Sequence, residues 1–143
     1  MFQPLILSVL SGFIAQTIKF FLNKMDHKFQ LRDVVVYSGM PSGHSAMVIS
    51  LAASIGLIEG IKSAAFAVAV IFAIIVIRDA IGLRRYLGQH GKVLNILVKD
   101  LKDDSVLDEK YPHLLENIGH TPAQIMVGAI IGLVVSLIGY LLL

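Results

Sequence analysis

The sequence predicts an all-α integral membrane protein with four transmembrane helices and an amphipathic interfacial helix in the loop between spans three and four. Of its 143 residues, 56% are hydrophobic and only 15% are charged, whereas a soluble domain carries about 25% charged residues. The mean hydropathy is +0.79. The apolar residues form long blocks, and a helix that crosses a bilayer needs about 20 of them. We therefore expect a single membrane domain, residues 1–143.

Four apolar blocks are the expected spans: about 2–22, 42–59, 63–83 and 121–143. The first contains one charge, Lys19, and residues 42–58 of the second contain none. The third passes Arg78 and Asp79, which must lie near membrane depth or reach the interface. The fourth is uncharged and has Pro122 in its first turn, where the missing N–H costs nothing.

Residues 91–102 between spans three and four have the pattern of an amphipathic helix. One stripe of this segment is apolar: Val93, Leu94, Leu97, Val98 and Leu101. A helix lying on the membrane surface is the simplest interpretation. Two Gly-x3-Gly spacings, Gly56/Gly60 and Gly128/Gly132, also permit close approach between helices.

The charge bias of the loops predicts the orientation of a multi-pass protein in the cell membrane. The connections after spans one and three carry nine basic residues: Lys24, Lys28, Arg32, Arg84, Arg85, Lys92, Lys99, Lys102 and Lys110. The opposite side carries only Lys62. Because basic loops stay in the cytoplasm, we expect these two loops inside and both termini outside.

The stretch from Gly39 to Ala46 places a polar turn directly before the second span. A helix N-terminus offers free N–H groups and a positive dipole end to an anion. Ser42 is a candidate cap, and His44 could exchange a proton with a bound oxyanion. The alternative is an ordinary helix start whose histidine contacts headgroups or a backbone carbonyl.

The predicted topology gathers further polar residues at this membrane face. They share a position at the inner end of a span: Lys19, Arg78, Asp79, Arg84, Arg85 and His120. Two histidines surrounded by cations form an oxyanion site, and lipid phosphate is the natural anion at this depth. Simpler interpretations are a snorkelling Lys19, basic flanks at Arg84 and Arg85, and a local ion pair between Arg78 and Asp79.

Two histidines can transfer a phosphoryl group without a metal or any other cofactor. One attacks phosphorus to form a phosphohistidine, and the other protonates the leaving alkoxide. Lysine and arginine neutralise the charge that develops on the equatorial oxygens.

Three motifs in order give the chain a resemblance to a known superfamily. Pro41–His44 is identical to the Pro-Ser-Gly-His motif of the type-2 phosphatidic acid phosphatase superfamily, and residues 120–132 look like its third motif. The chain most resembles the divergent branch called acid phosphatase/vanadium-dependent haloperoxidase-related. The similarity to that branch extends to residues 79–85, Asp-Ala-Ile-Gly-Leu-Arg-Arg, and 119–122, Gly-His-Thr-Pro.

The resemblance implies roles for five residues. His120 matches the nucleophile and His44 the general acid. Lys19 matches the lysine of the first motif, and Ser42 and Gly43 match the phosphate cradle.

Some positions depart from the superfamily pattern. Asp26 and Leu114 stand where arginines are usual, so Arg84 and Arg85 would have to bind phosphate in their place. Gln124 replaces the aspartate that orients the nucleophile; its carbonyl could accept the Nδ1–H of His120. We hypothesise that Asp79 supplies the missing carboxylate.

The leading prediction is a membrane-embedded phosphatase that hydrolyses a lipid phosphate or pyrophosphate through a phosphohistidine. The alternative is a catalytically weak protein that binds or transports phospholipid headgroups. We expect a membrane lipid as the substrate and no nucleic-acid partner. The superfamily core has six helices against four here, so a homodimer could complete it.

Overall fold

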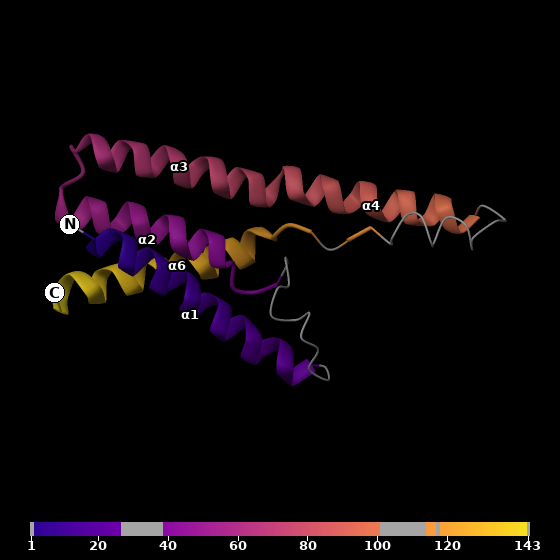
Figure 1. Cartoon of the computed structure of the whole chain (residues 1–143), viewed down its shortest axis with the longest axis horizontal. Helices are drawn as coiled ribbons and strands as arrows, with labels where there is room; N and C mark the ends of the chain where they lie inside the picture. Colours follow the sequence, from indigo (N-terminus) through magenta and orange to yellow (C-terminus); the bar gives the residue numbers. More distant parts are fainter. Residues whose placement is uncertain (1, 27–38, 101–113, 117, 143) are drawn as a thin grey trace.

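The computed structural model describes residues 2–26, 39–100, 114–116 and 118–142. Within these ranges the chain forms only helices, so the all-α prediction is confirmed (Figure 1). The helices are α1 (Gln3–Asp26), α2 (Gly43–Ile58), α3 (Ala64–Ile81), α4 (Leu83–Asp100) and α6 (Pro122–Leu142). The loops with Lys28, Arg32, Lys102 and Lys110 lie outside the described residues.

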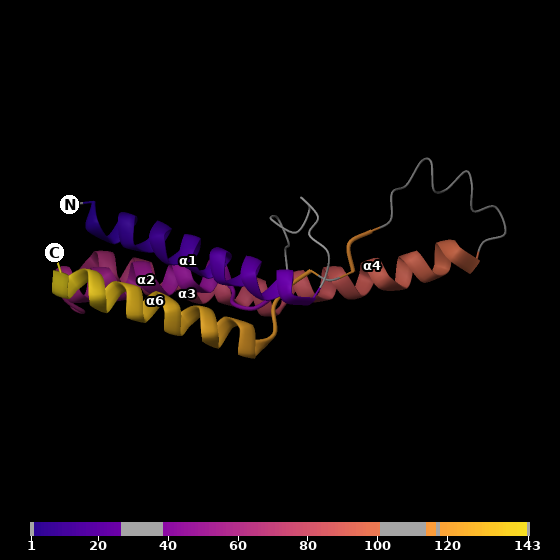
Figure 2. The same cartoon turned by 90° about the horizontal axis from the view of Figure 1, so that it is seen from below.

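Three helical stretches are long and apolar enough to cross a membrane: Gln3–Leu22, Ala64–Val98 and Pro122–Leu142. The helix expected as the second span, α2, is shorter, with 16 residues, or about 24 Å. It contacts α1, α3 and α6, and α1 also contacts α6. Figures 1 and 2 show that α1 begins and α6 ends at the same end of the bundle. The start of α2, the end of α3 and the start of α6 therefore meet at the opposite end.

Small residues let α2 pack closely against its neighbours. Its buried positions are Ser45, Ala46, Val48, Ser50, Ala52 and Ser54. The hydroxyls of Ser50 and Ser136 are 2.8 Å apart across the α2–α6 contact. Ser8 and Ser11 of α1 donate to carbonyl oxygens of α2 at 2.9 and 3.0 Å. Because lipid provides little hydrophobic drive between helices, such packing and hydrogen bonds hold the bundle together.

The expected close approach at Gly128 and Gly132 is confirmed. A Cβ on Gly128 would collide with the Ser45 hydroxyl and the Ser42 carbonyl, and one on Gly132 would collide with the Ala46 carbonyl. These colliding groups all belong to α2 or its cap, and two are backbone atoms. The backbone of α6 therefore lies directly on the first turns of α2.

The other Gly-x3-Gly spacing is not a packing pair. A Cβ on Gly56 would lie 2.9 Å from the ring of Phe66. Gly60 has no neighbour within 4 Å and has a φ of +89°, a turn conformation that L side chains rarely adopt. The expectation of close helix approach was therefore wrong for Gly60, whose glycine serves the α2–α3 turn.

The amphipathic helix after α3 exists but begins earlier than expected, at Leu83 instead of Gly91. Only Gly82 separates it from α3, and hydrogen bonds continue across the break: Gly82 N–H to Arg78 O at 2.9 Å and Tyr86 N–H to Gly82 O at 3.1 Å. Because no linker intervenes, α4 continues nearly in line with α3 (Figures 1 and 2). Its apolar residues, including Val93, Leu94 and Leu97, are exposed.

Enlarging the glycines at the α2–α6 contact should destabilise the bundle. Gly128→Val and Gly132→Val each force the α6 backbone away from α2, and overpacking of this kind costs about 1–3 kcal/mol. We expect a lower unfolding midpoint in detergent, followed by circular dichroism. Ala67→Val, at an exposed position of α3, is the matched control and should leave the midpoint unchanged. Equal midpoints for all three variants would contradict the prediction.

Candidate functional site

The two motif histidines lie side by side at the end of the bundle where α2 and α6 begin. His44 is in the first turn of α2, and His120 lies two residues before α6. Their ring centroids are 6.3 Å apart with an interplanar angle of 73°. His120 is only 3% exposed, whereas His44 is exposed. The structure thus brings together two residues that are 76 positions apart in sequence, one buried and one open.

The Pro-Ser-Gly-His turn is fastened to the first turn of α6. Ser42 is the N-cap of α2 and its hydroxyl accepts the Ser45 N–H at 3.4 Å, so the predicted cap is confirmed. The Ser42 N–H donates to Gln124 O at 3.1 Å, and the Ser45 hydroxyl donates to Ile125 O at 3.1 Å. Ser42 is fully buried, so its hydroxyl serves the cap. The N–H groups at N1 and N2, those of Gly43 and His44, have no acceptor within the helix.

The backbone of His120 is held by the junction of α3 and α4. Its N–H donates to Ala80 O at 3.0 Å. The preceding residue, Gly119, has a φ of +106°, and a Cβ there would lie 2.9 Å from the backbone nitrogen of Arg85. Both the backbone conformation and the close approach require glycine at this point.

Neither ring nitrogen of His120 has a hydrogen-bond partner within the part of the chain that the structure describes, although both are buried. The expected contact with Gln124 is not formed. The side-chain carbonyl of Gln124 accepts the backbone N–H of Thr121 at 2.9 Å, and the Thr121 hydroxyl accepts the backbone N–H of Gln124 at 3.3 Å. This reciprocal pair is a capping box at the start of α6. The orienting role of Gln124 stays a prediction.

Lys19 of α1 is a buried cation at the same site. It is 4% exposed, and among the described residues no carboxylate lies within ion-pair distance of its ammonium group. The backbone of Gly39 lies against its methylene chain. Burying an unpaired charge is expensive, and an anion bound beside the histidines would compensate for it.

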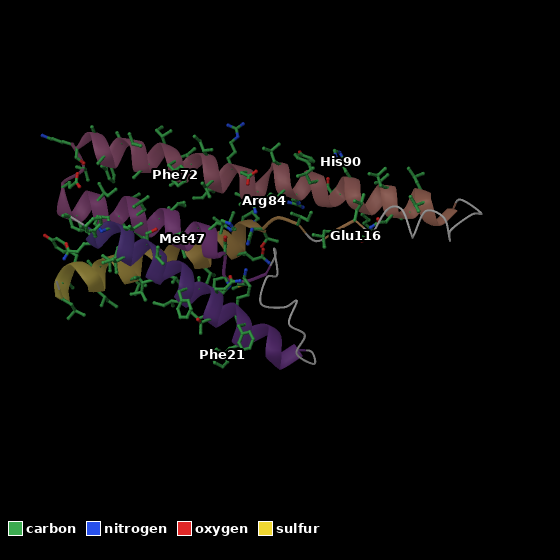
Figure 3. The ribbon with its side chains drawn as sticks, in the orientation of Figure 1. Phe21, Met47, Phe72, Arg84, His90 and Glu116 are labelled. Carbon is green, nitrogen blue, oxygen red and sulfur yellow. The ribbon has the colours of Figure 1, made fainter. Side chains whose placement is uncertain are left out.

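Asp79 is bonded to Arg84, and it makes no hydrogen bond to His120 in this structure. The Arg84 Nε donates to the Asp79 Oδ2 at 2.6 Å, and both side chains are about one-third exposed. The alternative of an Arg78–Asp79 pair is not observed among these residues, because Asp79 pairs five positions ahead, across Gly82. Figure 3 shows Arg84 at the α3–α4 junction.

Arg85 faces a different space from Arg84. It borders a cavity of about 370 Å³ that also reaches His120 and Gln124. The other lining residues are Gly88, Gln89, Lys92, Glu116, Ile118, Gly119 and Thr121. Sequence reasoning missed Gln89, Lys92 and Glu116, although the spacing 85, 89 and 92 places three polar side chains on one helix face.

The surroundings of His120 favour its neutral form. Burial is the main cause, and the charges of Lys19, His44 and Arg84 act in the same direction, so that the pKa of His120 is lowered to about 4. A ring nitrogen of His120 therefore carries a free lone pair at neutral pH, as a nucleophile requires.

Removing the Lys19 charge should raise the pKa of His120. In the unliganded protein in detergent, we expect the His120 imidazole to titrate near pH 4, below the ordinary value of about 6.5. In Lys19→Met, we expect it to titrate at a higher pH than in the parent. Histidine-selective NMR measures both. Lys62→Met, which removes a charge at the opposite end of the bundle, is the control and should leave the titration unchanged. A His120 that titrates at its ordinary value in the parent would contradict the prediction.

Comparison with known proteins agrees with the motif resemblance. Residues 2–135 match the family described as "Divergent PAP2 family". A protein of Bacillus subtilis (strain 168) described as "Uncharacterized membrane protein YuiD" is 35% identical over 145 residues, an alignment that covers 94% of this chain and 92% of the relative. No solved structure matches. With the match over nearly its whole length, this membrane protein belongs to the Divergent PAP2 family.

Proposed function

We propose that the protein is a membrane phosphatase that hydrolyses a lipid phosphate or pyrophosphate through a phosphohistidine on His120, without a metal. One observation carries the proposal. A buried histidine, whose ring nitrogens have no hydrogen-bond partner among the described residues, faces a second, exposed histidine beside the buried Lys19. A neutral nucleophile, an accessible acid and a buried cation together suit attack on a phosphate anion.

In the first step a His120 nitrogen attacks phosphorus and the bond to the lipid oxygen breaks. Protonated His44 gives its proton to the leaving oxygen. Lys19, Arg84 and the first N–H groups of α2, those of Gly43 and His44, hold the phosphate oxygens. With 6.3 Å between the ring centroids, a phosphoryl group on His120 lies within reach of His44.

In the second step water attacks the phosphohistidine. His44, now neutral, takes a proton from that water, the P–N bond breaks, and inorganic phosphate leaves with His120 neutral again. His44 returns to its protonated form for the next cycle. One histidine thus acts as acid and then as base, as in other two-step transfers.

The Asp79–Arg84 pair modifies the role predicted for Asp79. Its carboxylate contacts the Arg84 guanidinium at 2.6 Å, which supports a role in aiming Arg84 at the substrate. Arg85 borders the cavity next to His120, which supports binding of the polar part of the substrate from the side of α4.

If Asp79 aims Arg84, Asp79→Asn should impair turnover about as much as Arg84→Ala does, and the double variant should impair it no more than either alone.

The two histidines should be essential in different ways. His120→Ala should abolish phosphate release and the acid-labile phosphohistidine, and His44→Ala should lower kcat about 10²–10⁴-fold. Phosphate release from phosphatidic acid, phosphatidylglycerol phosphate and a polyprenyl pyrophosphate in detergent measures both. His90→Ala, at an exposed position of α4, is the control. Neither EDTA nor this control variant should reduce the rate; inhibition by EDTA would contradict a metal-free mechanism.

A second candidate function is binding or transport of phospholipid headgroups. The absence of a carboxylate bonded to His120 among the described residues favours it, because nothing there stabilises an imidazolium. If no lipid phosphate in the panel is hydrolysed, headgroup transfer between vesicles is the function to measure.

Homodimerisation stays a prediction, and native mass spectrometry that finds only a monomer would contradict it.

The loop charges support a site that faces the cytoplasm. The chain contains no cysteine, so single substitutions report sidedness without background. Lys62→Cys, between α2 and α3, should react with a membrane-impermeant maleimide in intact cells. His90→Cys, on α4, should react only after permeabilisation. The reverse pattern would contradict the proposed orientation.

A further inference from the structure

We propose that Asn95 of α4 is a positioning residue for His120, because its side chain clamps the segment that leads to this histidine. Asn95 touches neither histidine of the site, and no motif of the sequence includes it. The proposal deepens the phosphatase function proposed above, but its main measurement does not depend on turnover.

The clamp consists of three hydrogen bonds. The Asn95 Nδ2 donates to Leu114 O at 2.9 Å, and the Leu114 N–H donates to the Asn95 Oδ1 at 3.1 Å. The same Nδ2 also donates to the Glu116 Oε1 at 2.9 Å. An amide suits this position, because its NH2 donates and its oxygen accepts side by side in one plane. Figure 3 shows Glu116 on this segment, next to α4.

Two glycines of α4 let the clamped segment lie directly on the helix. A Cβ on Gly88 would collide with Glu116 O, and one on Gly91 would lie 2.8 Å from Leu115 O. Gly88, Gly91 and Asn95 are three and four residues apart, so they share one face of α4. We call this face of α4, which consists of Gly88, Gly91 and Asn95, the docking track.

The clamped segment leads to His120. After Glu116, the chain passes Gly119, which lies against the Arg85 backbone, and reaches His120, whose N–H is bonded to Ala80 O. The segment is thus attached to α4 at residues 114–116 and to the α3–α4 junction at residues 119–120. Loss of the first attachment leaves His120 held on this side by the contacts of residues 119–120 with the α3–α4 junction, so the ring should become more exposed and less well aligned.

Asn95→Asp is the sharpest variant, because aspartate keeps the shape but loses both donated bonds and places a carboxylate beside Leu114 O and Glu116. In the full chain in detergent, we expect the His120 titration to move up from its low value toward that of an exposed histidine. Carbethoxylation of His120, followed by mass spectrometry, should become faster. In the phosphatase assay kcat should fall about 10- to 100-fold with little change in KM, since misplacement of a reacting group affects the chemical step.

Gly91→Val blocks the same track without altering the amide and should reproduce these changes. Asn95→Gln keeps the amide, so it should change the titration and carbethoxylation of His120 less than Asn95→Asp does. His90→Ala, one residue from the track, should behave as the parent. The thermal unfolding midpoint of each variant identifies general loss of structure. The proposal is overturned if Asn95→Asp and Gly91→Val both leave the titration and carbethoxylation of His120 as in the parent. If those change but no variant or parent releases phosphate, the positioning role stands and the phosphatase function fails.

Discussion

The rest of the structure depends on the direct contact of the α6 backbone with the first turns of α2. Gly128 and Gly132 create that contact, because any side chain at either position would collide with Ser45, Ser42 or Ala46. At this distance the cap residue Ser42 and Ser45 of the first turn of α2 donate hydrogen bonds to the carbonyl oxygens of Gln124 and Ile125. His44 is two residues from Ser42 and His120 is four residues from Gln124, so the packing of the two helices sets their separation. Wider packing would separate His44 from His120 and dismantle the site.

The buried polar groups of the site support the proposal that it binds an anion. The structure buries Lys19 without a carboxylate partner among the described residues and buries both nitrogens of His120 without a hydrogen bond. Each arrangement lowers stability, and both lie beside the exposed His44. A phosphate group would satisfy all of them at once. Strained or unsatisfied groups that cluster in this way are typical of functional sites.

Much of this architecture could be predicted from local sequence. The apolar blocks predicted the helices, and Ser42 was recognised as a cap because capping depends on residues within one turn. The gathering of Lys19, His44 and His120 followed from topology, since helix ends on one membrane face must lie near each other. The start of α4 was missed because Gly82 resembles a helix end, and only the hydrogen bonds across it show that the chain continues in the same direction.

The class of fold, the family and the two histidines can be read from the amino-acid order, because hydrophobic length and short motifs are properties of neighbouring residues. Which side chains bond to one another at the site became clear from the folded arrangement. Gln124 bonds to Thr121 and Asp79 bonds to Arg84, although either could have been aligned with His120. Asn95 holds Leu114, nineteen residues away, through a contact that no local pattern indicates. The contact of Asn95 with Leu114, and the distance of Gln124 and Asp79 from the His120 ring, depend on how separate segments pack, and that packing exists only once the chain is folded.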